Sequence, residues 1–249
     1  MARYKLKLDT IKWDEIEADT DATTGQRVYH TPAGPAMSVT TILGTLPHPE
    51  LDEWRERVGE EEADRISLEA TTIGTYMHDM LEAHLLKRDL PYDGSELEAI
   101  GKSMAKVIRM FGWQKLQEVW AVEMPLHFMD LYAGRTDLVG VYAGKPAIMD
   151  YKTAKYIKPP DQLENYRLQM AAYSLAVENQ YGIKCDIGVN FFSIRPNKEY
   201  NKPAQSHIVV MDEAMMYEYK LKWAEILINF YADDLSKLDS LEAMLTMIG

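Results

Sequence analysis

Two aspartates and a lysine lie close together in an apolar, turn-containing stretch, and carboxylates of this kind can bind a divalent cation. Twelve residues separate Asp137 from Asp150, and Lys152 follows the second aspartate after a single residue. Ala143 and Gly144 lie about midway, so we expect a turn there that pairs the flanking strands and brings the two aspartates together. Because residues two apart on a strand share a face, Lys152 joins Asp150.

The spacing alone also fits a hairpin edge with solvated charges, which is the simpler interpretation. The residues just before Asp150 read "PAIM", which is typical of a buried strand. A carboxylate at the end of such a strand is costly unless it is paired or bound to a metal ion. This context counts against scattered surface charges and favours a binding site.

A second group of polar residues lies in "IGTYMHDMLEAH", a segment with helical periodicity. His78 and Glu82 are four residues apart and therefore share one face of the helix, while Gly74 allows a backbone or a ligand to approach closely. We expect Asp79 and His84 to face solvent. Taken alone, His78 is better explained as an ordinary core or surface histidine.

Three further residues have a polar group in a suggestive position. Gln169 and Tyr173 are four apart on one face of a predicted helix, and Glu123 lies on a predicted strand before the hairpin. The simpler interpretations are a tyrosine packed at the edge of the core and an ordinary cross-strand charge. None of the three would support a function by itself.

The elements that position these residues follow from hydrophobic periodicity and turn residues. We expect a hairpin over 27–43, helices over 50–88 and 96–117, and an antiparallel meander of four short runs from 119 to about 153. A helix over 159–182 would begin with a capping box of Asp161 and Glu164 and end at Gly182. Two strands over 186–195 and 206–211 and helices from 213 complete the chain.

This order of elements predicts an α/β fold in an α+β arrangement, with a sheet that helices flank. The chain has 249 residues and no repeat or flexible linker, so we expect a single domain over 1–249. Its parts would be a hairpin and helical part over 1–118, a sheet core over 119–211 and C-terminal helices over 212–249.

Composition limits the classes of function. The net charge of −12 counts against a protein that simply coats nucleic acid, although residues 145–202 hold nine bases and six acids. The single cysteine, Cys185, excludes a disulfide framework, a cysteine-based zinc site and a four-cysteine iron–sulfur cluster. The sequence shows neither a membrane-length apolar run nor a signal-peptide core, so we predict a cytoplasmic protein.

Four motifs occur together in the order of one known family. The chain resembles the RecB-like exonuclease branch of the PD-(D/E)XK nuclease superfamily in "GTYMH", "GRTD", "DYK" and "QMAAY". The segments "SVTTIL" and "WRERVGEEEADRI" are similar to phage and mitochondrial-maintenance exonucleases of this branch. Thr136 replaces the usual proline, the cysteines of the iron–sulfur members are missing, and no phosphate-binding loop is present. We therefore expect neither a helicase motor nor a nucleotide cofactor.

The resemblance implies a restriction-endonuclease-like core and assigns roles to the residues above. His78, Asp137, Asp150 and the Tyr151 carbonyl would hold one or two Mg²⁺ or Mn²⁺ ions. Lys152 would orient the attacking water or stabilise charge in the transition state. The residues that would support the site or position DNA are Gln169, Tyr173, Glu123, Arg135, Lys155, Lys158 and Arg167.

The function that the resemblance implies is a metal-dependent DNA exonuclease that acts on single strands or DNA ends in replication, recombination or repair. A phage-encoded member would act in the host cytoplasm. Two alternatives stay open, namely a structure-specific or restriction-type endonuclease and an inactive DNA-binding scaffold with the same fold. A separate helicase, polymerase or single-strand-binding protein would be a natural partner. Polarity, preference for DNA or RNA, oligomeric state and the role of the C-terminal helices stay open.

Overall fold

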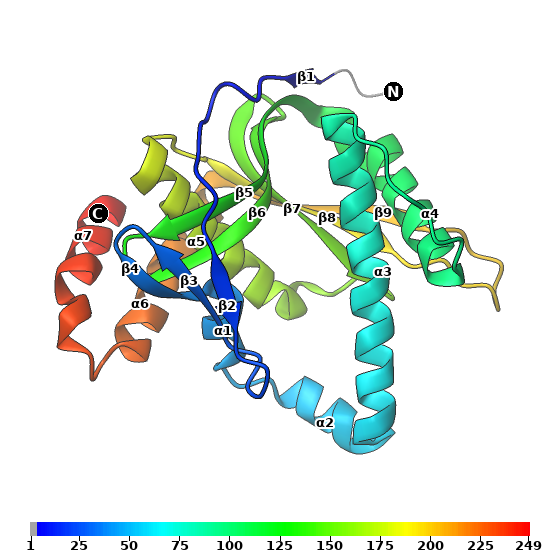
Figure 1. Ribbon diagram of the computed structural model, residues 1–249, viewed down its shortest axis with the longest axis horizontal. Coiled ribbons are helices and arrows are strands. Elements are labelled where there is room, and N and C mark those ends of the chain that lie inside the picture. Colours follow the sequence, from blue (N-terminus) through cyan, green and yellow to red (C-terminus); the bar gives the residue numbers. More distant parts are fainter. Residues whose placement is uncertain (1–3) are drawn as a thin grey trace.

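The computed structural model describes residues 4–249, which fold around one mixed, mostly antiparallel sheet (Figure 1). Seven strands lie in the order β2-β3-β4-β6-β7-β8-β9, while β5 pairs with β6 on one side and with β1 on the other. This arrangement confirms the predicted α/β fold class. The strands are β1 (Lys5–Leu6), β2 (Ala18–Thr20), β3 (Arg27–Thr31), β4 (Gly34–Ser38), β5 (Leu116–Phe128), β6 (Tyr132–Tyr142), β7 (Lys145–Ala154), β8 (Ile187–Ile194) and β9 (Gln205–Met211).

Helices cover both faces of the sheet, and each face has its own hydrophobic core. The helices are α1 (Val39–Gly44), α2 (Pro49–Val58), α3 (Glu60–Leu86), α4 (Glu96–Phe111), α5 (Glu164–Tyr181), α6 (Glu213–Phe230) and α7 (Leu238–Ile248). Helices α3 and α4 pack on one face, and α1, α5, α6 and α7 pack on the other. Helix α2 lies away from the sheet, where it joins the lower end of α3 (Figure 1). Among these described helices, none has the length and apolar character needed to cross a membrane.

The meander β5-β6-β7 forms the centre of the sheet. Strands β5 and β6 pair antiparallel, β6 and β7 pair antiparallel, and β8 lies parallel to β7. The parallel pair requires a crossover, which α5 supplies as it runs over the sheet between β7 and β8. The two predicted late strands and the C-terminal helices are confirmed.

The N-terminal hairpin is shorter than predicted. Strands β3 and β4 form it, but residues 39–43, which we expected to continue as a strand, form helix α1. The Ser38 hydroxyl accepts a hydrogen bond from the Thr41 amide at 2.9 Å and caps the helix. Val39, Ile42 and Leu43 then share one buried helical face. The cap and this spacing outweigh the strand preference of the β-branched residues.

Three other boundaries differ from the prediction. The helix expected over 96–117 ends at Phe111, because the chain tightens into a 3₁₀ turn that buries Trp113. The four expected meander runs form three strands, because the second and third runs join through Arg135 and Thr136 into the continuous strand β6. The capping box at the start of α5 is wrong: Glu164 binds Tyr219 and Lys222 of α6, and Asp161 lies in a 3₁₀ turn. The end of α5 at Gly182, which has a φ of 65°, is confirmed.

Gly140 allows β5 and β6 to approach each other closely at a bulge. A β-carbon at this position would lie 2.1 Å from the Glu118 carbonyl oxygen, which is a backbone atom that has little room to move. We expect Gly140→Ala to lower the free energy of unfolding by about 3 kcal/mol, measured by urea denaturation. The control is Gly44→Ala, where nothing lies within 4 Å, and we expect a change below about 0.5 kcal/mol. Equal losses in both variants would contradict this account of the bulge.

Candidate active site

The hairpin of β6 and β7 brings the two aspartates together as predicted. Ala143 and Gly144 form the turn with left-handed φ values of 51° and 85°, as a tight two-residue hairpin requires. Leu138 pairs with Met149, and the neighbouring residue on the side away from the turn is Asp137 in β6 and Asp150 in β7. The carboxylate of Asp137 accepts a hydrogen bond from the Tyr151 amide at 2.5 Å.

Lys152 lies next to Asp150, also as predicted. Its ammonium nitrogen is 2.6 Å from Asp150 Oδ2, and both side chains are largely buried. The two groups form a buried ion pair. Burial raises the pKa of Asp150 to about 6 despite the opposing effect of Lys152. Burial lowers the pKa of Lys152, but Asp150 and Asp137 outweigh it and leave the lysine firmly charged.

His78 reaches the same point from α3. Its Nδ1 atom is 3.3 Å from Asp137 Oδ1, and its Nε2 atom is 3.1 Å from the Tyr151 carbonyl oxygen. Burial lowers the pKa of His78, but the charge of Asp137 and its hydrogen bond raise the pKa by more, so that the net value is about 9. Burial likewise raises the pKa of Asp137, and His78 lowers it below its ordinary value. Without a metal ion, the histidine and the aspartate therefore form an ion pair.

Glu123 completes a compact group of possible metal ligands with His78 and Asp137. One ligand atom from each of the three lies within 4.8 Å of the others. Glu123 has a left-handed φ of 51°, and its carbonyl oxygen accepts a hydrogen bond from Arg135. Burial and the charge of Asp137 raise the pKa of Glu123 to about 8. Asp150 lies outside this group and is paired with Lys152 instead.

The sequence placed Glu123 only among the supporting residues. The missing signal was the register of β5 and β6, in which Val122 pairs with Leu138 and Met124 pairs with Thr136. This register sets Glu123 opposite Asp137. It depends on the turn after Phe128, which the sequence analysis did not predict.

The donor set fits a divalent metal ion. One imidazole nitrogen, several carboxylate oxygens and a backbone carbonyl are the ligands that Mn²⁺ and Mg²⁺ accept. The ligands come from α3, β5, β6 and β7, so they meet only in the folded chain.

Gln169 and Tyr173 lie together on α5 and pack against the hairpin from the face of the sheet opposite to α3. The Gln169 amide donates a hydrogen bond to the Tyr173 hydroxyl at 3.1 Å, and both side chains are buried. The tyrosine ring fills the space above Gly134, where a β-carbon would lie 2.6 Å from the ring. The pair therefore packs against β6 three residues before Asp137.

The predicted basic residues divide into two groups. Arg135 binds the carboxylate of Glu15, and Arg167 donates a hydrogen bond to the Tyr219 hydroxyl at 3.2 Å, toward α6. These two side chains are held by other parts of the protein. Lys155 and Lys158 instead line a cavity next to the site, and neither has an acidic partner among residues 4–249. Asp79 and His84 are exposed, as expected.

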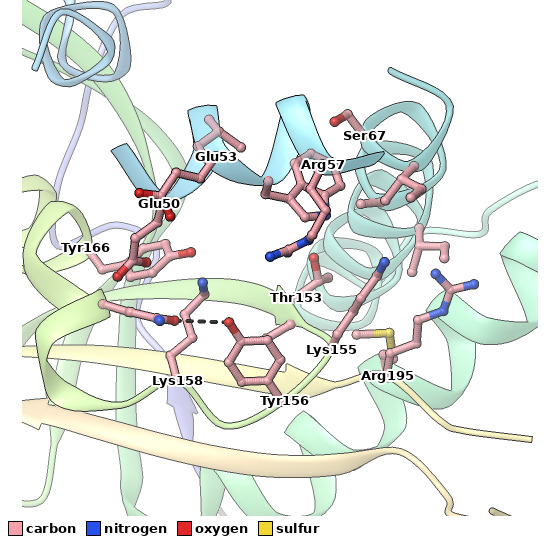
Figure 2. Close-up of a pocket in the computed structure, with 18 residues that line it drawn as sticks. Glu50, Glu53, Arg57, Ser67, Thr153, Lys155, Tyr156, Lys158, Tyr166 and Arg195 are labelled. Carbon is pink, nitrogen blue, oxygen red and sulfur yellow. Dashed lines mark hydrogen bonds between the residues drawn. The ribbon is translucent and has the colours of Figure 1, made fainter. Parts of the chain in front are cut away.

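This cavity, which we call the α2–α3 groove, lies between α2, α3 and the end of β7 (Figure 2). Its volume is about 660 Å³, and Figure 2 shows Arg57 projecting from α2 toward Lys158 and Tyr156 on the opposite wall. Tyr166 also lines the groove, and its ring centroid is 5.7 Å from the Lys152 ammonium nitrogen. Thr153 lines both this groove and the depression beside His78, so the two are continuous.

The sequence analysis missed several residues of the groove. It did not assign a role to Trp54, Arg57, Tyr156 or Tyr166. The segment "WRERVGEEEADRI" entered only through its resemblance to related exonucleases. Its helical period gave no sign that α2 faces the end of β7.

A sheet that carries acids and a lysine on its central hairpin, with a histidine from a covering helix, is characteristic of one class of nucleases. The model of the PD-(D/E)XK nuclease superfamily matches residues 25–243, so the chain belongs to this superfamily.

Two relatives share the same printed name, mitochondrial genome maintenance exonuclease 1. The mouse protein is 28% identical over 202 residues, which cover 75% of this chain and 56% of the relative. The *Xenopus tropicalis* protein is 28% identical over 207 residues, which cover 78% of this chain and 57% of the relative. The chain thus spans little more than half the length of these relatives.

Solved structures show more distant likenesses. The structure of SSO0001 has a TM-score of 0.37 at 14% identity, and the match covers 78% of this chain and 76% of that chain. A phage-related exonuclease from Haemophilus somnus 129PT has a TM-score of 0.34 at 13% identity, with coverage of 66% and 82%. The assignment to the superfamily does not depend on them.

The raised pKa values of His78 and Glu123 predict how the stability of the metal-free protein varies with pH. Both groups hold a proton more tightly in the folded than in the unfolded chain, so the stability they contribute is lost as pH rises toward 8 and 9. In excess chelator, we expect Tm to fall by at least about 3 °C between pH 6.5 and pH 9.

The comparison is with Glu123→Gln in the same buffers, where one of the two titrating groups is removed and the fall should be smaller. The measurement is thermal unfolding followed by circular dichroism. A wild-type Tm that is constant or rises over this range would contradict the described environment of both residues.

Proposed function

We propose that this chain is a divalent-metal-dependent deoxyribonuclease that removes nucleotides from single strands or DNA ends. The observation that carries the proposal is the meeting of His78, Asp137, Asp150 and Lys152 at one hairpin. Membership of the nuclease superfamily and the exonuclease names of the two relatives support it. We propose roles in replication, recombination or repair on the same grounds, and one nuclease domain over the whole chain.

In this proposal, His78, Asp137, Asp150 and the Tyr151 carbonyl hold Mg²⁺ or Mn²⁺, with Glu123 as a further carboxylate donor. The ion, when bound, polarises the scissile phosphate and lowers the pKa of the attacking water. The Tyr151 amide fixes one oxygen of Asp137 by its hydrogen bond, and the other oxygen lies 3.3 Å from His78 Nδ1. The carboxylate donors thus keep a defined orientation before any ligand binds.

Lys152 is the proposed positive group beside the reacting phosphate. Its pKa is raised, so it stays protonated at neutral pH and can donate hydrogen bonds to a water or to a phosphate oxygen. Asp150 anchors one side of the ammonium group, and the ring of Tyr166 lies near it. These contacts hold the lysine where charge would develop in the transition state.

The α2–α3 groove is the proposed path of the DNA strand. Arg57, Lys155 and Lys158 offer charges for phosphates, and the Tyr156 ring is 56% exposed. Cations beside an exposed aromatic ring suit a single strand, since its unpaired bases can stack while its phosphates bind the cations. This combination favours single strands or frayed ends over an intact duplex.

Lys152→Met tests the catalytic assignment. We expect the turnover number on an end-labelled single strand with Mn²⁺ or Mg²⁺ to fall by about 10³-fold, because a preorganised positive group is lost. Lys145→Met is the matched control on the same strand, since Lys145 is half exposed and pairs only with Glu213, at 3.5 Å. Circular dichroism checks that both variants fold. Equal turnover numbers for the two variants would contradict the proposed role of Lys152.

The same preparations separate the alternatives. A wild-type protein that degrades the end-labelled strand but leaves a closed circle intact is an exonuclease. Cleavage of the circle would favour an endonuclease. A protein that binds DNA and cleaves neither substrate with either metal would favour the scaffold alternative.

Tyr156→Ala tests the path of the strand. Loss of one stacking partner should raise KM for a single-stranded oligonucleotide by about 10-fold and leave kcat within about twofold. Tyr200→Ala is the control, because this tyrosine is also exposed but lies in the connection between β8 and β9. An unchanged KM in Tyr156→Ala would remove the α2–α3 groove from the proposed substrate path.

A further inference from the structure

A second large groove lies between the C-terminal half of α3 and α4, and the nuclease chemistry does not use it. We call it the α3–α4 groove. Its volume is about 1480 Å³, which exceeds the range of about 300–1,000 Å³ typical of small-molecule sites. Helices α3 and α4 run beside each other in Figure 1 and form its walls, and Tyr4 and Leu6 border it from the N-terminal segment. Its size suits a segment of a macromolecule.

The groove is strongly basic within an acidic protein. Asp89 is its single acidic lining residue, against five basic ones: Lys87, Arg88, Lys102, Lys106 and Arg109. Arg88 binds Glu82 at 3.0 Å, while the other four have no acidic partner among residues 4–249. The net charge of the chain is −12, so this concentration of unpaired cations requires an explanation. An anionic ligand supplies one.

The side chain of Arg109 lacks a hydrogen-bond acceptor for its Nε atom within the described protein. This atom is also shielded from solvent. A guanidinium group without an acidic partner can bind a carboxylate through its terminal N–H groups. The half-buried side chain is held on α4, so a bound carboxylate would meet a preorganised donor.

The aromatic residues of the groove differ in exposure: Tyr92 is 59% exposed, whereas the others pack against one another. The Lys102 ammonium nitrogen lies 4.7 Å from the centroid of the Tyr92 ring and covers one face of it. Trp113 is only 1% exposed, and the rings of Tyr4 and His84 pack on it with centroid distances of 5.5 and 5.9 Å. Binding of single strands without sequence preference stacks successive bases on several aromatic faces, and the packing of the other rings leaves Tyr92 as the main one here.

The rest of the lining is apolar and suits hydrophobic side chains. Met80, Leu85, Leu90 and Met110 contribute to it from α3, α4 and the connection between them. An apolar lining with a basic rim complements a peptide that carries both carboxylates and apolar side chains.

We propose that the α3–α4 groove binds a short acidic segment of a partner protein, with its carboxylates on Lys102, Lys106 and Arg109 and its apolar side chains on the floor. His78 and Glu82 line the depression at the candidate active site, while Met80, His84 and Lys87 line this groove. A bound partner therefore lies beside the nuclease site without covering it. The proposal does not depend on the nuclease assignment, because peptide binding is measured without DNA.

The experiment selects peptides on the full-length chain from a display library of random decapeptides. We expect the enriched sequences to combine at least two Asp or Glu residues with Leu, Phe or Trp. A fluorescent synthetic copy of the most enriched peptide should bind the wild type at least 10-fold more tightly than the double variant Lys102→Glu/Lys106→Glu. Both lysines are exposed, so the variant should fold, as circular dichroism will verify.

Two controls make the result specific. Lys155→Glu/Lys158→Glu reverses the same number of charges in the α2–α3 groove and should leave peptide affinity within about twofold. Lys102→Glu/Lys106→Glu should in turn keep the wild-type cleavage rate. A library without enrichment, or equal peptide affinity in the wild type and this variant, would overturn the proposal. The proposal also fails if the variant loses affinity for labelled oligo(dT) instead, which would make the groove a nucleic-acid site.

Discussion

The register of the β6–β7 hairpin is the constraint on which the candidate site depends. Ala143 and Gly144 both adopt left-handed φ values, and the two-residue turn they form permits a single pairing of the strands. That pairing lets the Asp137 carboxylate accept a hydrogen bond from the Tyr151 amide. It also places Asp150 next to Asp137 across the two strands. Because side chains alternate along a strand, a slip of one residue would turn the aspartates to opposite faces of the sheet. The turn therefore determines the ligand geometry from a distance.

The same register concentrates charge in a buried place, and the charges compensate one another in pairs. His78 takes a proton and pairs with Asp137, and Lys152 pairs with Asp150. Glu123 is the third acid of the cluster and has no cationic partner in these pairs, and burial together with the charge of Asp137 raises its pKa. A buried cluster with one excess carboxylate is unfavourable by itself. A divalent ion would remove that excess, so affinity for metal and low stability without it have the same physical origin.

The sequence predicted the parts of this arrangement that depend on local pattern. The hairpin turn, the neighbourhood of Asp150 and Lys152, and the end of α5 at Gly182 are confirmed, since each follows from turn residues or from alternation along one strand. The position of Glu123 and the walls of the α2–α3 groove were not predicted. They depend on the register between β5 and β6 and on where α2 lies in space, and single-sequence periodicity carries neither. The catalytic roles themselves stay predictions.

The two proposed binding grooves would let an acidic chain attract anions at separate places. In the α2–α3 groove, cations stand beside the exposed ring of Tyr156, and Trp54 and Tyr166 add further aromatic rings to the lining. In the α3–α4 groove, Lys102 covers one face of Tyr92, and Trp113 is buried under its neighbours. The first arrangement suits bases with phosphates, and the second suits carboxylates with aliphatic side chains. Helix α3 borders both grooves and carries His78 between them, so a ligand in either groove would lie against the helix that supplies a proposed metal ligand.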